Sequence, residues 1–154
     1  MMWLSDETFK SIIQHTPLIS IDLIVRNEQG EVLLGKRVNA PAKGYWFVPG
    51  GRVQKNETLD DAFVRLVKEE LGIESGINRA DAKFLGVFEH FYDDCVFGSG
   101  VGTHYIVLAY TFSLTNIKKI YSFTQHHEFK WIDNSITDEN LHKYSKLYFN
   151  FGKY

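Results

Sequence analysis

The sequence predicts an α/β fold in which one mixed β-sheet is packed between helices. Several short runs of apolar residues have the composition of strands, and most of them can pair with a neighbour in the sequence. One amphipathic segment, residues 58–71, has apolar residues at helical spacing and is inserted early among these strands. This order of elements favours a mixed sheet.

Length and composition indicate a single domain over residues 1–154. With 44% hydrophobic and 15% aromatic residues, the 154-residue chain can form one proper core but is too short for two ordinary domains. A net charge of −2 without a basic run argues against a nucleic-acid polymer as partner. Cys95 is the only cysteine, so no disulfide can form within the chain. Neither a secretory signal nor an apolar run long enough to span a bilayer is present, so we expect a cytoplasmic protein.

The part of the chain before residue 58 predicts a short helix followed by a β-hairpin. Ser5 or Asp6 can cap the helix, which should end before Pro17 because proline disfavours helical conformation in the preceding residue. The run LISIDLIVR is apolar enough for a strand, and a turn ending at Gly30 leads into a return strand. The expected elements are a helix from residue 5 or 6 to 14, strands over 18–26, 31–38 and 45–49, and turns at 27–30 and 50–51.

The remainder predicts the central helix, three strands and a terminal helix. Thr58, with Asp61 three residues later, is a suitable helix start, and Gly72 is a suitable stop. A glycine-rich loop should separate the first two of these strands. The expected elements are a helix over residues 58–71, strands over 83–92, 103–114 and 128–132, and a helix over 140–151 with aromatic residues on one side.

One carboxylate of the central helix is in an unusual place. At about 100° per residue, five residues form one apolar arc with Glu70 near its centre. A carboxylate in an apolar seam is unfavourable by several kcal/mol unless a cation or hydrogen-bond donors meet it, which points to a metal ion. The alternative is a solvated helix end with an ion pair between Arg65 and Glu69. The arc comprises Leu59, Ala62, Phe63, Leu66 and Val67.

The stretch around this helix resembles the Nudix box, G-x5-E-x7-R-E-U-x-E-E-x-G-U, in which U is bulky and apolar. The pattern is long, so the match is far more specific than a lone glycine loop. One position departs, since Leu66 stands where the family has its first helical Glu, often a metal ligand or general base. The matching residues are Gly51, Glu57, Arg65, Val67, Glu69, Glu70, Gly72 and Ile73.

The resemblance extends to a branch of that family, the GDP-mannose mannosyl hydrolases, over residues 17–131. It is carried by LLGKR, GYWFVPGGRVQK, HFYDD, THY and QHHEFKW. This branch also lacks the first helical Glu, which makes Leu66 an expected feature. The resemblance implies an α/β/α sandwich with the Nudix fold, and a homodimer that acts on a small-molecule nucleotide sugar. It also implies water attack at the anomeric carbon with inversion, so that GDP leaves whole.

The resemblance assigns roles to individual residues. Mg2+, with Mn2+ as the alternative, is expected at the Gly50 carbonyl, the Glu70 carboxylate and the Gln125 side chain. Glu57 is expected to hold the loop instead of the ion, and Glu69 either to lie behind the metal ligands or to pair with Arg65. The expected diphosphate contacts are Arg37 and Arg52, the expected general base is His126, and Asp22, His90 and Tyr105 are expected around the sugar and diphosphate.

Simpler interpretations of these residues stay open at the level of sequence. Arg37 suits a surface arginine beside a strand, and His126 and His127 suit an exposed loop. His90 and Tyr105 suit structural positions in a strand. Two other functions also remain: an ordinary Nudix pyrophosphatase that cleaves at phosphorus, and a nucleotide-sugar binding module without catalysis.

Overall fold

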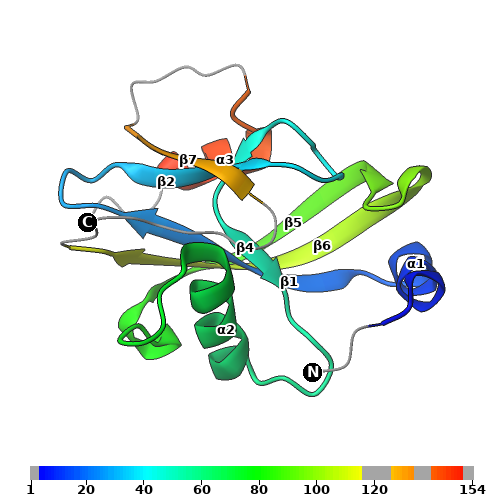
Figure 1. Cartoon of the computed structure of the whole chain (residues 1–154), viewed down its shortest axis with the longest axis horizontal. Coiled ribbons are helices and arrows are strands. Elements are labelled where there is room, and N and C mark those ends of the chain that lie inside the picture. Colours follow the sequence, from blue (N-terminus) through cyan, green and yellow to red (C-terminus); the bar gives the residue numbers. More distant parts are fainter. Residues whose placement is uncertain (1–3, 116–125, 134–139, 151–154) are drawn as a thin grey trace.

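The computed structural model describes residues 4–115, 126–133 and 140–150. Within them, seven strands form one mixed sheet with helices on both faces, which confirms the predicted α/β class (Figure 1). The helices are α1 (Asp6–His15), α2 (Leu59–Leu71) and α3 (Lys143–Lys146), with 3-10 turns η1 (Arg79–Asp81) and η2 (Leu147–Asn150). The strands are β1 (Leu18–Arg26), β2 (Val32–Arg37), β3 (Trp46–Phe47), β4 (Gly50–Arg52), β5 (Lys83–Cys95), β6 (Gly98–Ser113) and β7 (His126–Ile132).

The central strand β1 has a divided edge. On one side it runs parallel to β6 over its whole length, from Leu18 opposite Tyr105 to Arg26 opposite Ser113. On the other side it pairs antiparallel with β2 only at its end and with β4 nearer its start. Across the sheet the strands lie in the order β3-β2-β1-β6-β5, and β7 pairs with β2. The turn expected at Gly50 and Gly51 is therefore wrong, because both residues belong to β4.

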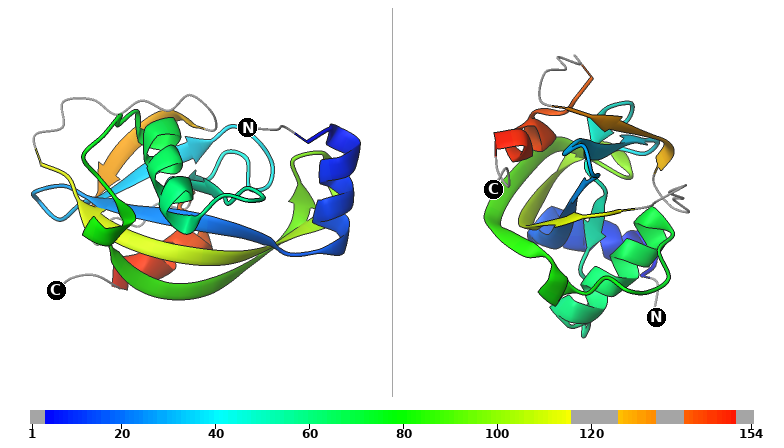
Figure 2. Two further views of the ribbon diagram at one scale, coloured as in Figure 1. Left: turned by 90° about the horizontal axis from the view of Figure 1, so that it is seen from below. Right: turned by 90° about the vertical axis from the view of Figure 1, so that its left-hand side faces the viewer.

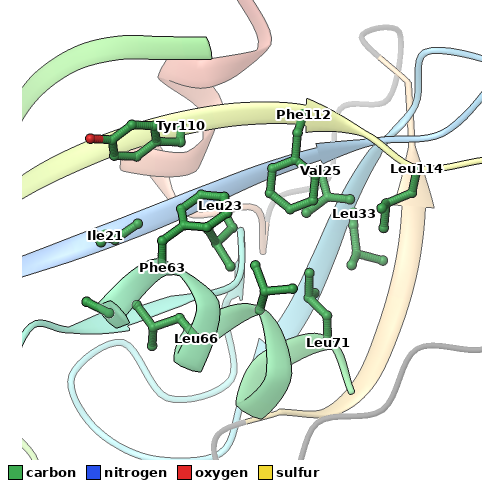
Figure 3. Packing of buried hydrophobic residues seen from close by; sticks show 12 residues of the cluster. Ile21, Leu23, Val25, Leu33, Phe63, Leu66, Leu71, Tyr110, Phe112 and Leu114 are labelled. Carbon is green, nitrogen blue, oxygen red and sulfur yellow. The ribbon is translucent and has the colours of Figure 1, made fainter. Parts of the chain in front are cut away.

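Helix α2 begins and ends where its sequence predicts. The Thr58 side chain accepts a hydrogen bond from the Asp61 amide at 3.1 Å, and Gly72 ends the helix in the left-handed region at φ 72°. Its apolar face packs against one face of the sheet (Figure 3). The cluster comprises Ile21, Leu23, Val25, Leu33, Ala62, Phe63, Leu66, Val67, Leu71, Tyr110, Phe112 and Leu114.

The C-terminal segment covers the opposite face of the sheet (Figure 2). Side chains alternate along β1, so Leu23 packs in the α2 cluster and Ile24 in the second cluster. The single helix expected over 140–151 is wrong. Leu141 instead forms a parallel bridge to Trp46 of β3, with hydrogen bonds from the Trp46 amide to the Asn140 carbonyl at 2.8 Å and from the His142 amide to the Trp46 carbonyl at 3.1 Å. The second cluster comprises Ile24, Val32, Leu34, Val48, Ala109, Ile132, Leu141, Tyr148 and Phe149.

Helix α1 packs against the far end of the β5–β6 hairpin (Figure 2). Its start is capped by Ser5, whose side chain accepts from the Thr8 amide at 3.2 Å. The glycine-rich loop expected between β5 and β6 is largely strand, since β5 continues to Cys95 and β6 begins at Gly98. This long hairpin brings its tip beside α1. None of the helices in the described residues is long and apolar enough to cross a membrane.

Candidate functional site

A cleft of about 260 Å³ opens where β1 separates from β2 and turns to β4. Its walls come from α1, α2, six strands and the segment 39–41 that follows β2. Residues far apart in the sequence therefore meet in one concave site, the usual form of a small-molecule site. Seven of the residues expected from sequence line it: Asp22, Arg37, Gly50, Arg52, Glu70, His90 and Tyr105.

Two glycines allow β4 to lie close to its neighbours at the floor of the cleft. A Cβ atom on Gly50 would lie 2.4 Å from the Ile21 carbonyl oxygen and 2.8 Å from Oδ1 of Asp22. A Cβ atom on Gly51 would lie 2.5 Å from Cδ2 of Leu66. Glycine is therefore needed at these positions because neighbouring atoms lie too close for a Cβ atom, and not because the backbone angles are unusual.

The acidic side of the cleft is formed by α2. Glu70 is only 2% exposed and lines the cleft together with Glu69. Leu66, one turn before Glu70, is also 2% exposed and packs in the α2 cluster. The position of the missing box glutamate is thus filled by a core side chain that touches β4, and the helix offers no carboxylate there.

Arg65 ties the acidic helix to the preceding loop. Its guanidinium donates to Glu69 at 2.9 Å, to the Arg52 carbonyl at 2.8 Å and to Glu57 at 3.0 Å. Glu57 also accepts from the Gln54 amide at 2.9 Å. Burial opposes ionisation of Glu57, but the hydrogen bonds from Arg65 and Gln54 hold the pKa of Glu57 below its usual value. Glu57 and Glu69 therefore hold the loop and Arg65, as the sequence predicted.

Two arginines supply positive charge to the cleft. The Arg52 guanidinium lies over the Phe9 ring, 4.5 Å from its centre. The Nε of Arg37 donates to the Pro41 carbonyl at 2.8 Å, and its guanidinium lies 5.7 Å from the centre of the Phe47 ring. Contacts with neighbouring groups therefore hold both side chains at the cleft wall, where they suit an anionic ligand.

Polar side chains from β1, β5 and β6 also line the cleft. Burial raises the pKa of Asp22 to about 7, against the opposing effects of its hydrogen bond from Tyr148 and of Arg37. His90 is 4% exposed and its ring stacks on Tyr144 at 4.1 Å. Burial and the neighbouring His142 lower the pKa of His90 to about 4, so its ring is neutral at pH 7. Burial also raises the pKa of Tyr105 above its usual value.

The oxygen donors in the cleft suit a hard divalent cation such as Mg2+. The Glu70 carboxylate and the Gly50 backbone both line the cleft, and Glu69 lies at its edge. The described residues contain no group of three or more His, Cys, Asp or Glu that could hold a metal ion by themselves. A few protein oxygens completed by ligand phosphates and water are typical of Mg2+.

Two of the predicted site residues remain, Gln125 and His126. Gln125 lies outside the described residues. His126 begins β7, where its backbone pairs with that of Arg37. Sequence reasoning missed the aromatic wall residues Phe47 and Tyr92, although they lie within the motifs GYWFVPGGRVQK and HFYDD that carry the resemblance.

Comparisons with known proteins agree with this architecture. A sequence profile described as the NUDIX domain matches residues 16–147. The low-salt glycan biosynthesis protein Agl8 of Haloferax volcanii is 42% identical over 143 residues, which cover 93% of this chain and 86% of that protein. The ADP-ribose pyrophosphatase of Methanocaldococcus jannaschii is 42% identical over 57 residues, covering 37% of this chain and 33% of that protein.

Solved structures share the fold. The MutT protein of Methanosarcina mazei superposes with a TM-score of 0.67 at 24% identity, covering 88% of this chain and 93% of its own. The MutT Nudix hydrolase of Burkholderia pseudomallei superposes with a TM-score of 0.68 at 24% identity, covering 88% and 98%. Because the profile spans most of the described sheet and the whole Nudix box, the chain belongs to the Nudix family.

Proposed function

We propose that this Nudix hydrolase converts GDP-mannose, and also GDP-glucose, to GDP and the free sugar. Water attacks the anomeric carbon with inversion of its configuration, and the bond from that carbon to the diphosphate oxygen breaks. One observation carries the proposal: the buried Leu66 replaces the helical carboxylate, while the rest of the cleft keeps its acidic and cationic residues. Because Glu69 pairs with Arg65 and Glu70 is assigned to the metal, the proposed base for the attacking water comes from outside α2.

A relative supports a nucleotide sugar as the substrate. Agl8, to which 93% of this chain aligns at 42% identity, is named for glycan biosynthesis. Glycan assembly consumes activated sugars, and a nucleotide sugar combines an anionic diphosphate with a hydroxyl-rich ring. The cleft offers matching groups in Arg37 and Arg52 for the diphosphate and Asp22 for a hydroxyl.

The two arginines stabilise the diphosphate as it leaves. As the bond between carbon and oxygen breaks, negative charge grows on the diphosphate, and guanidinium groups already in place stabilise it. Gly50, Glu70 and Gln125 are the proposed ligands of Mg2+, which when bound supplies further neutralisation of the diphosphate. The described part of this set, Gly50 and Glu70, lies in the same cleft as the arginines.

His126 is the proposed general base. It accepts the proton of the attacking water, and an imidazole with an ordinary pKa of about 6.5 suits this task near neutral pH. Its backbone pairs with Arg37, a residue that lines the cleft, so β7 brings the chain to the site at this point. His127, the next residue, has no proposed role.

Product analysis with GDP-mannose and Mg2+ tests the proposal. Release of GDP and mannose supports it, and the mannose should form with inverted configuration. In water labelled with oxygen-18, the label should enter mannose, because attack occurs at carbon. Label in GMP or in mannose 1-phosphate would place the attack at phosphorus and overturn the proposal.

The second candidate is a nucleoside diphosphate sugar pyrophosphatase. It is favoured by the local identity of 42% with an ADP-ribose pyrophosphatase over 57 residues. This reaction would give GMP and sugar 1-phosphate from the same substrate. The two candidates thus share the substrate class and differ in the bond that breaks, and one product assay separates them.

A further inference from the structure

The C-terminal segment contributes a buried tyrosine to the wall of the cleft. Tyr148 lies in η2, is 0% exposed, and donates from its hydroxyl to Oδ2 of Asp22 at 2.7 Å. The two residues are 126 positions apart in the sequence. Tyr148 does not line the cleft itself, so it can act on a ligand only through a residue that does.

The packing around Tyr148 fixes the position of its hydroxyl. Its ring meets Phe88 edge-on, with the ring centres 5.1 Å apart. Ser145, one helical turn earlier and 1% exposed, accepts from the Val48 amide at 3.1 Å. The C-terminal segment is thus held by contacts both at the tyrosine and one turn before it. The hydroxyl has little freedom, so it constrains Asp22 rather than following it.

The two oxygens of the Asp22 carboxylate have different neighbours. Oδ2 accepts from Tyr148, whereas Oδ1 lies beside Gly50, 2.8 Å from the place where a Cβ atom of that residue would be. Asp22 lines the cleft, so Oδ1 is the oxygen directed toward Gly50 at the cleft floor. A carboxylate repels a diphosphate but accepts readily from a hydroxyl, so its natural partner on a nucleotide sugar is the sugar.

We propose that Tyr148 is a positioning residue for the sugar end of the substrate, because its hydroxyl holds the Asp22 carboxylate with Oδ1 presented to a sugar hydroxyl. This inference rests on the proposed nucleotide-sugar substrate. His90 adds to the same arrangement, since its Nε2 lies 3.5 Å from the Tyr148 hydroxyl. The C-terminal segment is then part of the substrate site and not only a cover for the sheet.

The test compares Tyr148→Phe with the wild-type protein on GDP-mannose and on GDP. Removing the hydroxyl keeps the ring and its contact with Phe88. We expect kcat/KM for GDP-mannose to fall about tenfold, because a hydrogen bond to a charged group is lost. The Kd for GDP, which lacks the mannosyl group, should stay unchanged. A merely structural role would weaken both ligands together and lower the unfolding temperature, and that result would overturn the proposal.

A second comparison uses Asp22→Asn alone and together with Tyr148→Phe. If the tyrosine acts through Asp22, the double variant should lose no more activity than Asp22→Asn. Independent, multiplicative losses would contradict the proposal. Tyr110→Phe is the matched control, since Tyr110 is also buried and its hydroxyl accepts from Arg79 at 3.1 Å, outside the cleft. It should leave kcat/KM unchanged.

The outcomes for the two proposals are distinct. If the wild-type protein releases GMP and mannose 1-phosphate, attack at the anomeric carbon is wrong, but the ratio between Tyr148→Phe and wild type still measures the role of the tyrosine. If the wild-type protein releases mannose and Tyr148→Phe matches it, the proposed function holds and the positioning role is wrong. Absence of any wild-type hydrolysis of GDP-mannose overturns both.

Discussion

Two glutamates that are neighbours in the sequence have different environments in the cleft. The side chain of Glu69 is 32% exposed and pairs with Arg65, whereas Glu70 is 2% exposed. Because Arg65 also holds Glu57 and the Arg52 carbonyl, Glu69 belongs to a network that fixes the loop. Glu70 is buried in the cleft, which the Gly50 backbone also lines, so we expect it to be the better ligand for a cation.

Replacement of Glu70 by Gln should therefore weaken activation by Mg2+. We expect the Mg2+ concentration for half-maximal activity to rise by about tenfold or more, since even residues that only orient metal ligands have effects of this size. Titration of activity with Mg2+ measures the change. Glu69→Gln is the matched control and should shift the midpoint much less. Equal shifts in both variants would show that the ligand assignment is wrong.

His126 gives a kinetic prediction. His126→Gln should lower kcat by roughly 10²–10⁴-fold with little change in KM, because a general base acts on the reaction step and not on binding. Steady-state kinetics with GDP-mannose measure both constants. His127→Gln, one residue along β7, should stay close to the wild-type rate. A nearly normal kcat in His126→Gln would remove this residue from the mechanism.

Sequence reasoning at this scale works for residues whose environment follows from local periodicity. The burial of Glu70 follows from the helical spacing of its apolar neighbours, and the structure confirms it. Asp22 interrupts an apolar strand, and because a buried carboxylate without a partner is unfavourable, its position predicts that a partner exists. That the partner is Tyr148 could not be predicted, because 126 residues separate the two and nothing local joins them.

At the scale of elements, β4 and α2 make a close contact between Gly51 and Leu66. The helix supplies a core side chain where the box has a carboxylate, and the strand supplies a residue without a side chain opposite it. The backbone of β4 can then lie against both β1 and α2.

Gly51→Ala should disturb this contact in a way that depends on Leu66. The new Cβ atom would lie 2.5 Å from the Leu66 side chain, and overpacking of this kind destabilises by about 1–3 kcal/mol. Urea unfolding measures the change. In a Leu66→Ala background the same substitution should be less destabilising, because the clashing atoms are gone. Equal destabilisation in both backgrounds would show that the contact is not the cause.

The elements themselves were predictable where their signals are local. Ser5, Thr58 and Gly72 mark helix ends by side-chain capping or backbone freedom, and the structure confirms all three. Strand β4 was not predictable as a strand, because two glycines in succession favour a turn and only pairing with β1 keeps them extended. The last helix was predicted too long for a similar reason, since its first residues bond to β3.

At the scale of the whole molecule, the division of the β1 edge between β2 and β4 creates the cleft. Helix α2 approaches it from one face of the sheet and the C-terminal segment from the other (Figure 2). Helix α1 and the hairpin tip close one end, where Phe9 and Val96 line the cavity. Titratable groups from distant parts of the chain are consequently desolvated together, and the stability of the fold should depend on pH.

The direction of this pH dependence follows from the shifted pKa values of the buried groups. Burial first, and then nearby positive groups, lower the pKa of His142 to about 4, as for His90. In the unfolded chain both histidines have pKa values of about 6.5, so the unfolded state binds more protons between these limits. Their contribution to stability is therefore complete above about pH 6.5 and is lost as the pH falls toward 4. Asp22, with its pKa raised to about 7, acts in the opposite direction and loses stability as the pH rises through this range.

His142→Asn removes one of these contributions and also the effect of His142 on the pKa of His90. The Nδ1 of His142 accepts from the Tyr144 amide at 3.3 Å and caps α3, and asparagine keeps a capping acceptor but cannot titrate here. Urea unfolding at several pH values should show that the free energy of unfolding falls less steeply toward acid pH in the variant than in the wild type. The contribution of Asp22 cancels in this difference, since both proteins retain it. A difference in stability that stays constant between pH 4 and pH 6.5 would mean that His142 does not remain neutral in the folded protein, and that its desolvation beside Phe47 is not a source of acid sensitivity.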